Sequence, residues 1–204
     1  MAIVKPVTDP ISTNTHKEWN GVQPVCIWDF KDRTKDFDWA DIFLSVELRQ
    51  MDSDYSRFLE IAGRLDKDTS GLITGGFILK RLYHLFETIG FDGGLTPKNT
   101  WEDAKGNEIT NIGSHLNERF QTGNPIMDPS YDYAVYIYKE TPRKPGQKAY
   151  TKVHHKMYPN TTKGKADLTS HVDWMTKKGF IKEWHGEMPP VTTDTQTVLV
   201  GENL

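Results

Sequence analysis

Two stretches in the first third of the chain alternate apolar and polar residues with a period of two. Every second residue is aliphatic between positions 42 and 48, and a similar alternation resumes at 57–65 after a polar turn at 51–56. Such alternation is typical of strands that bury one face and expose the other. The pattern therefore predicts a β-hairpin.

A second pair of alternating runs follows at 133–138 and 149–158, separated by a loop that holds two prolines and a glycine. The register that buries Val135, Ile137 and Val153 puts a set of tyrosines and basic residues on the opposite face. We expect this tyrosine face to be open to solvent. Its members are Tyr136, Tyr138, Tyr150, Lys152, His154, Lys156 and Tyr158.

Apolar residues at helical spacing predict three helices. The clearest spans 77–89, and Gly90 is the expected C-terminal stop. Shorter helices are expected at about 111–120 and at about 167–178, the last ending at Gly179. Helices combined with antiparallel hairpins predict an α+β fold, a small antiparallel barrel with inserted and flanking helices.

The two ends of the chain show neither period. Residues 1–24 hold three prolines and many Thr and Asn, which predicts an extended N-terminal arm. Residues 188–204 are rich in Pro and Thr, which predicts a flexible C-terminal tail. A single domain is expected between them, at 25–187.

Bulk composition narrows the class of protein. The 204 residues include one cysteine, Cys26, which excludes an internal disulfide and fits a reducing compartment. No run approaches the roughly 18 apolar residues of a membrane helix, and the first residues do not resemble a secretion signal. We therefore expect a cytoplasmic protein without membrane contact.

Positive charge is concentrated in one segment of an acidic chain. Positions 139–182 hold eleven Lys and Arg against three acids, a net charge of +8, whereas the whole chain carries −3. Such asymmetry indicates a local polyanionic partner. Because tyrosines are interleaved with the lysines, single-stranded DNA is the expected partner.

The second hairpin supplies the candidate binding residues. Its tyrosines would stack on bases at roughly 1–3 kcal/mol each, and His154 would stack or gain charge below about pH 6.5. A plain surface hairpin stabilised by cross-strand pairs is the alternative. The expected stacking residues are Tyr136, Tyr138, Tyr150 and Tyr158, and the expected phosphate contacts are Arg143, Lys144, Lys148, Lys152 and Lys156.

A competing motif begins at Asp66. With Asp68, Ser70 and Gly71 it matches the first positions of an EF-hand calcium loop, but Phe77 stands at the twelfth position, where a bidentate Glu is required. A degenerate calcium site is therefore a weaker hypothesis than a polar turn.

Catalytic signatures are lacking in the sequence. Asp167 and His171 lie four residues apart on an expected helix, yet no third and fourth ligand follow at a recognisable spacing, and His154 and His155 are merely adjacent. We therefore expect no enzymatic activity, no cofactor and no metal.

The helical run at 78–91 and the hairpin at 133–158 together resemble the oligonucleotide-binding (OB) single-stranded-DNA-binding proteins of tailed phages, over roughly 40–160. The resemblance implies an OB-like barrel and a role in replication or recombination in the host cytoplasm, beside other proteins of those processes. The chain departs from that group in its tail, because 191–204 holds only two acids, Asp194 and Glu202. The alternative function is a non-enzymatic structural or interaction protein, such as a virion component.

Overall fold

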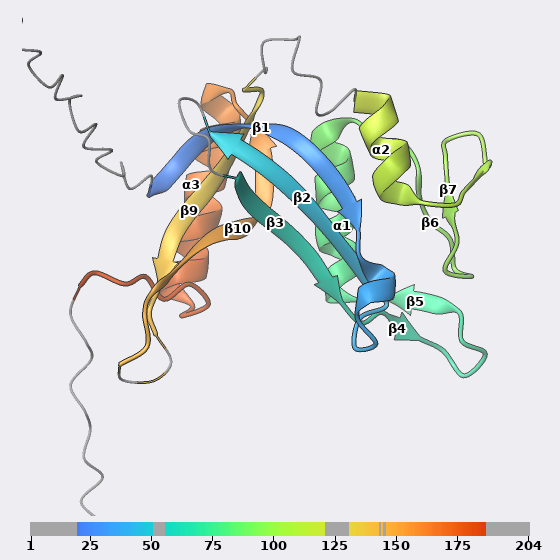
Figure 1. Ribbon diagram of the computed structural model, residues 1–204, viewed down its shortest axis with the longest axis horizontal. Helices are drawn as coiled ribbons and strands as arrows, with labels where there is room; N and C mark the ends of the chain where they lie inside the picture. The colour runs from blue at the N-terminus through green and yellow to red at the C-terminus, as the bar shows by residue number, and fades with distance from the viewer. Residues whose placement is uncertain (1–19, 51–55, 121–130, 143, 145, 187–204) are drawn as a thin grey trace, which may run out of the picture.

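A five-stranded antiparallel sheet forms the centre of the protein (Figure 1). The computed structural model describes residues 20–50, 56–120, 131–142, 144 and 146–186. The strand order is β10-β9-β1-β2-β3. The bounds are β1 Gly21–Asp32, β2 Ile42–Gln50, β3 Ser56–Gly63, β9 Tyr133–Glu140 and β10 Tyr150–Pro159.

Three α-helices accompany the sheet, which confirms the α+β class. They are α1 (Phe77–Ile89), α2 (Ile112–Phe120) and α3 (Thr162–Lys177). In Figure 1, α3 lies along β9 and β10 at one end of the sheet, and α1 and α2 lie at the other end. Gly90 ends α1 in the left-handed conformation, at φ 68°, as the sequence predicts.

Helix α3 begins five residues earlier than predicted. Thr161 is its N-cap, and the Thr161 hydroxyl accepts a hydrogen bond from the Gly164 N–H at 3.0 Å. Only glycine fits at position 164, since a Cβ there would lie 2.1 Å from the Pro159 carbonyl oxygen. The cap and this close approach tie α3 directly to the end of β10.

Both predicted hairpins are present, and their aliphatic faces form the core. Leu44, Val46 and Leu59 are buried between the sheet and α1, together with Leu82 and Phe86 of that helix. Val135, Ile137 and Met157 join the same core, as the alternation predicts. The predicted burial of these apolar residues of the second hairpin is therefore confirmed.

The central strand β1 has no counterpart among the predicted elements. It pairs with both β2 and β9, and its first residues, Gly21–Pro24, face Ile137–Ala134. These four residues belong to the predicted arm, so the sheet begins within that stretch. Residues 1–19 of the predicted arm, the predicted tail from 188 onward and positions 51–55 of the predicted turn lie outside the described residues.

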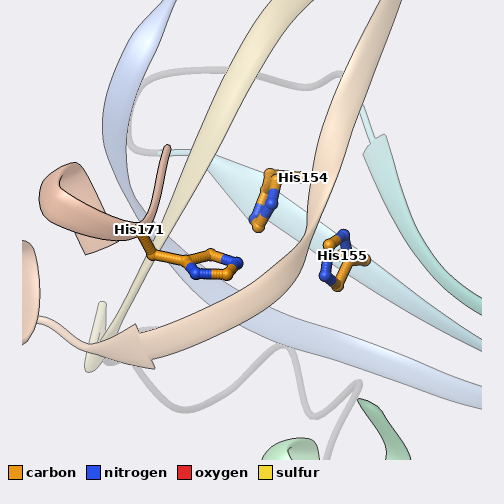
Figure 2. Close-up of side chains that lie close together, drawn as sticks. All are labelled: His154, His155 and His171. Atoms are coloured by element: carbon orange, nitrogen blue, oxygen red, sulfur yellow. The ribbon is translucent and has the colours of Figure 1, made fainter. Parts of the chain in front are cut away.

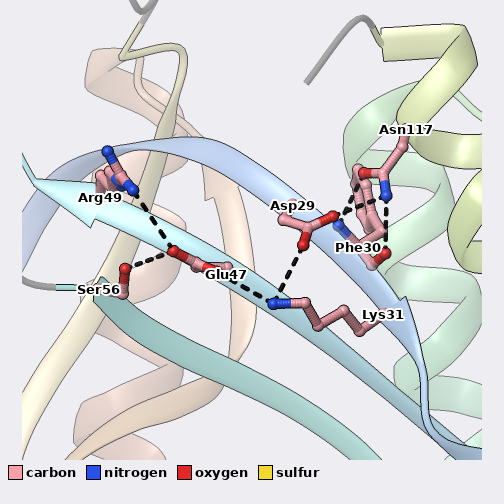
Figure 3. Close-up of polar contacts among 7 residues, drawn as sticks. All are labelled: Asp29, Phe30, Lys31, Glu47, Arg49, Ser56 and Asn117. Carbon is pink, nitrogen blue, oxygen red and sulfur yellow. Dashed lines mark hydrogen bonds and ion pairs between the residues drawn. The ribbon is translucent and has the colours of Figure 1, made fainter. Parts of the chain in front are cut away.

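A polar cluster joins β1 to α2 (Figure 3). The Asn117 side chain accepts the Phe30 N–H at 2.8 Å and donates to the Phe30 carbonyl oxygen at 2.8 Å and to Asp29 at 2.7 Å. Lys31 then bridges Asp29 at 3.2 Å and Glu47 at 3.5 Å. We call the contacts between Asn117, Phe30 and Asp29 the Asn117 junction.

Short strands make up two smaller sheets. One is a hairpin of β4 (Asp66–Lys67) and β5 (Ile73–Gly75). A strand, β3, and not a helix precedes this hairpin, so the helix–loop–helix frame of an EF-hand is not formed. Within the turn, one carboxylate oxygen of Asp68 accepts hydrogen bonds from the backbone N–H groups of Ser70 and Leu72, as in a polar turn. The other sheet contains β6 (Gly94–Leu95), β7 (Trp101–Glu102) and β8 (Glu108–Ile109), and a 3-10 turn, η1, spans Thr34–Asp36.

The five-stranded sheet curls but does not close. Its edge strands β3 and β10 come into contact, yet among the described residues no ladder of hydrogen bonds joins them. The predicted barrel is therefore open along this line, which we call the seam. No helix in the described part of the chain is long and apolar enough to cross a membrane.

Candidate functional site

Helix α3 covers the predicted tyrosine face. Tyr138 is only 9% exposed and packs in a cluster with Leu168 and Val172. Tyr136 is half-buried and donates a hydrogen bond to Glu183; burial and this carboxylate raise the pKa of Tyr136. For Tyr136 and Tyr138, the expectation of a face open to solvent is therefore wrong.

The other two tyrosines differ from each other. Tyr158 is half-buried, with its ring centroid 4.8 Å from that of His84. Tyr150, by contrast, is 68% exposed at the start of β10. Of the four tyrosines, Tyr150 alone is well exposed as a stacking surface.

The residues predicted to contact phosphates differ in their surroundings. Lys144 and Lys148 are exposed in the loop between β9 and β10, and Lys156 is half-buried. Lys152 is exposed and forms an ion pair with Glu140 at 2.6 Å. Arg143 lies outside the described residues.

A groove of about 860 Å³ opens at the seam. We call it the seam groove. Its walls come from β3, β9, β10, the start of α1, the end of α3 and the segment after α3. Its residues are Ser56, Arg57, Phe58, Glu60, Phe77, Arg81, Tyr138, Glu140, Thr151, Lys152, Val153, His154, His155, Trp174, Met175, Phe180 and Ile181.

Exposed aromatic rings gather in the seam groove. Phe58, Phe77, Trp174 and Phe180 are 47%, 65%, 49% and 64% exposed. They are four of the eight large hydrophobic side chains that are exposed in the described part of the chain. Rings held in water beside one another are favourable surfaces for a planar, apolar ligand face.

Three of these four rings, those of Phe77, Trp174 and Phe180, form a continuous row with three histidines. Neighbouring ring centroids lie 4.2 to 6.4 Å apart, within the range of aromatic contacts. The order of this ring row is Phe77, His155, His154, His171, Trp174 and Phe180.

Two arginines of the seam groove are incompletely satisfied. The Nε–H groups of Arg57 and Arg81 are buried and have no hydrogen-bond partner among the described residues, and no described carboxylate forms an ion pair with either. The Arg81 guanidinium lies 4.4 Å from the centroid of Phe77, and burial lowers the pKa of Arg81. Buried donors of this kind are normally paired, so the groove is suited to an anion.

A bulge in β10 explains how adjacent histidines come together (Figure 2). Val153 pairs with Ile137, but Met157 pairs with Val135, so β10 has two more residues than β9 over this interval. His154 and His155 lie in the bulge, where strict alternation to opposite faces is lost. His171 reaches them from α3, and the three rings form a cluster.

The two histidines of β10 are uncharged at neutral pH. Burial, His171 and Arg81 lower the pKa of His154 to about 4. Burial, His154 and Arg81 lower the pKa of His155 to about 2. The expectation that His154 gains charge below about pH 6.5 is therefore wrong.

Sequence reasoning missed the rings and arginines of the seam groove. A signal was present, because Phe77 and Trp174 lie outside the apolar stripes of α1 and α3. Aromatic residues off a buried stripe are exposed. Their convergence on one groove, however, depends on contacts between distant segments.

Comparison with known proteins gives no relative: no family model, no curated protein and no solved structure matches the chain. The site must therefore be interpreted from its own chemistry.

Proposed function

We propose that this protein binds single-stranded DNA in the seam groove with little sequence preference, as part of phage-type replication or recombination in the host cytoplasm. The observation that carries the proposal is the gathering in one groove of four exposed rings and two arginines whose Nε–H groups have no hydrogen-bond partner among the described residues. Unpaired bases offer flat apolar faces, and the phosphates between them offer anionic oxygens.

The parts of the groove have distinct roles in this proposal. Bases stack on Phe77, Trp174 and Phe180, which the ring row spaces along the groove. Phosphates accept hydrogen bonds from the guanidinium groups of Arg57 and Arg81, whose buried Nε–H groups have no other partner in the described chain. A duplex would keep its bases stacked and so leave the rings unused, which favours a single strand.

Two further features support the proposal. Lys144 and Lys148 are exposed in the loop that precedes β10, where a polyanion can reach them. Five antiparallel strands that curl without closing, with helices between the two hairpins, resemble the partly open barrel of the OB fold.

The test is a binding titration with labelled oligo-dT, followed by fluorescence anisotropy across a salt series. Affinity should fall steeply with salt, by about 0.7 in the log–log slope for each phosphate contact. Trp174→Ala should weaken binding by about 1–3 kcal/mol, or roughly 5- to 150-fold, because one stacking surface is lost.

Trp39→Ala is the matched control, since Trp39 is 50% exposed and lies outside the seam groove, whereas Trp174 is 49% exposed within it. Equal affinity losses in the two variants would contradict the assignment of the groove. A flat salt dependence without quenching of tryptophan fluorescence would instead favour the structural or interaction protein.

A further inference from the structure

We propose that His154, His155 and His171 form a binding site for a divalent transition metal, with Zn²⁺ as its expected occupant. The site joins β10 to α3 (Figure 2), and two of its members, His154 and His155, line the seam groove. It is independent of the proposed DNA binding.

Geometry carries the proposal. One ring nitrogen from each histidine can be chosen so that all three lie within 4.8 Å of one another. Zinc binds imidazole nitrogen at about 2.0–2.1 Å, so a tetrahedral site places its ligand nitrogens about 3.3 Å apart. Metal binding therefore requires the nitrogens to move closer together, and His155 and His171, which are only half-buried, are the rings that we expect to rotate.

Hydrogen bonding gives an independent reason. His154 is only 2% exposed, and its Nε2 atom is buried without a partner among the described residues. The Nε2 atom of His171 is also buried and unpaired in that part of the chain. Buried polar atoms are rarely left unsatisfied in folded proteins, and an ion held between these nitrogens would satisfy them.

Protonation does not compete with the metal. A histidine binds metal through a neutral imidazole. Burial lowers the pKa of all three side chains, so each is available as a ligand at neutral pH.

Positively charged side chains near the three histidines favour an anion as the fourth ligand of the metal. Arg81 and Lys156 lie close enough to depress the pKa of His154 and His155, and they also repel a dication. An anion on the metal offsets this repulsion. Three protein ligands leave one position for a fourth ligand. Because His154 and His155 line the groove, we expect hydroxide or another oxygen anion from the groove to take that position.

One local contact must change when the metal binds. The Lys156 N–H donates to Nδ1 of His154 at 3.2 Å, which places the ring proton on Nε2. Binding through Nε2 moves this proton to Nδ1 and opens the contact. Metal binding therefore costs the protein this one hydrogen bond between Lys156 and His154.

The experiment uses full-length protein stripped with EDTA, titrated with Zn²⁺ in competition with a chromophoric indicator. We expect one ion per chain. His155→Gln and His171→Gln remove a ligand and should each weaken binding by more than the roughly 10- to 100-fold that loss of an outer-shell partner costs. Co²⁺ should give the intense visible absorption of a four-coordinate site.

His185→Gln is the control, because His185 is exposed and lies outside the cluster. Melting curves in EDTA verify that every variant folds. Three results would each overturn the proposal. The first is a Zn²⁺ affinity of the wild type no higher than that of His171→Gln, and the second is an equal loss of Zn²⁺ affinity in His185→Gln. The third is the weak visible absorption that Co²⁺ gives in an octahedral site.

Discussion

Two polar clusters join a helix to the sheet, and they differ in how completely their groups are paired. At the Asn117 junction, the side-chain amide of Asn117 on α2 accepts a hydrogen bond from the Phe30 N–H and donates one to the Phe30 carbonyl oxygen (Figure 3). In the histidine cluster, His171 of α3 meets His154 and His155 without a hydrogen bond between them (Figure 2).

The location of each cluster explains the difference. In the described part of the chain, β1 pairs with β9 only as far as Val25, and the Asn117 side chain takes the Phe30 N–H and carbonyl oxygen on that edge. The histidines instead lie beside the open seam, where no described strand completes the sheet. Polar groups that stabilise the fold are paired internally, whereas those left unpaired beside a groove indicate a ligand.

Removing Asn117 should have the largest effect. Asn117→Ala leaves the Phe30 N–H and carbonyl oxygen without partners, and we expect it to lower the free energy of unfolding by about 2–4 kcal/mol. His155→Gln removes no internal hydrogen bond and should stay within about 1 kcal/mol of wild type. Urea denaturation of both variants in EDTA measures the contrast, and similar losses would refute it.

Acid should weaken the metal-free fold through the histidine cluster. The unfolded histidines protonate near pH 6.5, while the folded His154 and His155, with pKa values of about 4 and about 2, stay neutral beside Arg81, Lys156 and His171. The unfolded state then binds more protons, so stability is present above pH 6.5 and is lost as pH falls. Between pH 6.5 and 5.5, the free energy of unfolding should fall by about 1 kcal/mol for His154 and by about the same amount for His155.

Urea denaturation at both pH values in EDTA checks this result. His155→Gln should remove about 1 kcal/mol of the loss, since glutamine does not titrate. His84 and His171, whose pKa values burial also lowers, add to the loss in both proteins, so the difference between wild type and His155→Gln isolates the share of His155. The carboxylates with lowered pKa values, such as Asp41 and Asp103, titrate below this window. Stability that is unchanged across the window would show that the cluster is accessible to protons in the folded state.

Local patterns predicted much of the fold. The alternation in 42–48 and the apolar spacing of α1 each depend on a single segment, so a sequence is enough to recognise them. The same holds for the buried side of the second hairpin. Strand β1 was missed because it is central and half-buried along most of its length, which gives no clean alternation.

The site depended on contacts that no local pattern contains. Leu168 and Val172 give α3 an apolar face, but only the folded chain shows that this face covers Tyr136 and Tyr138. The bulge that brings His154 beside His155 arises from a mismatch between two strands. Charge and aromatic content predicted a basic, ring-bearing surface in the second half of the chain, whereas the groove also needs β3 and α1.

The smallest expected effect concerns a charge at the edge of the groove. Glu140 holds Lys152 at 2.6 Å, and both residues line the groove. If DNA binds there, Glu140→Gln releases Lys152 to the phosphates, which should raise oligo-dT affinity at low salt by less than about tenfold and steepen the salt slope by about 0.7. Asp167→Asn breaks the ion pair to Lys163, also 2.6 Å long, outside the groove, and should leave the slope unchanged. Equal effects would mean that net charge, and not the groove, controls binding.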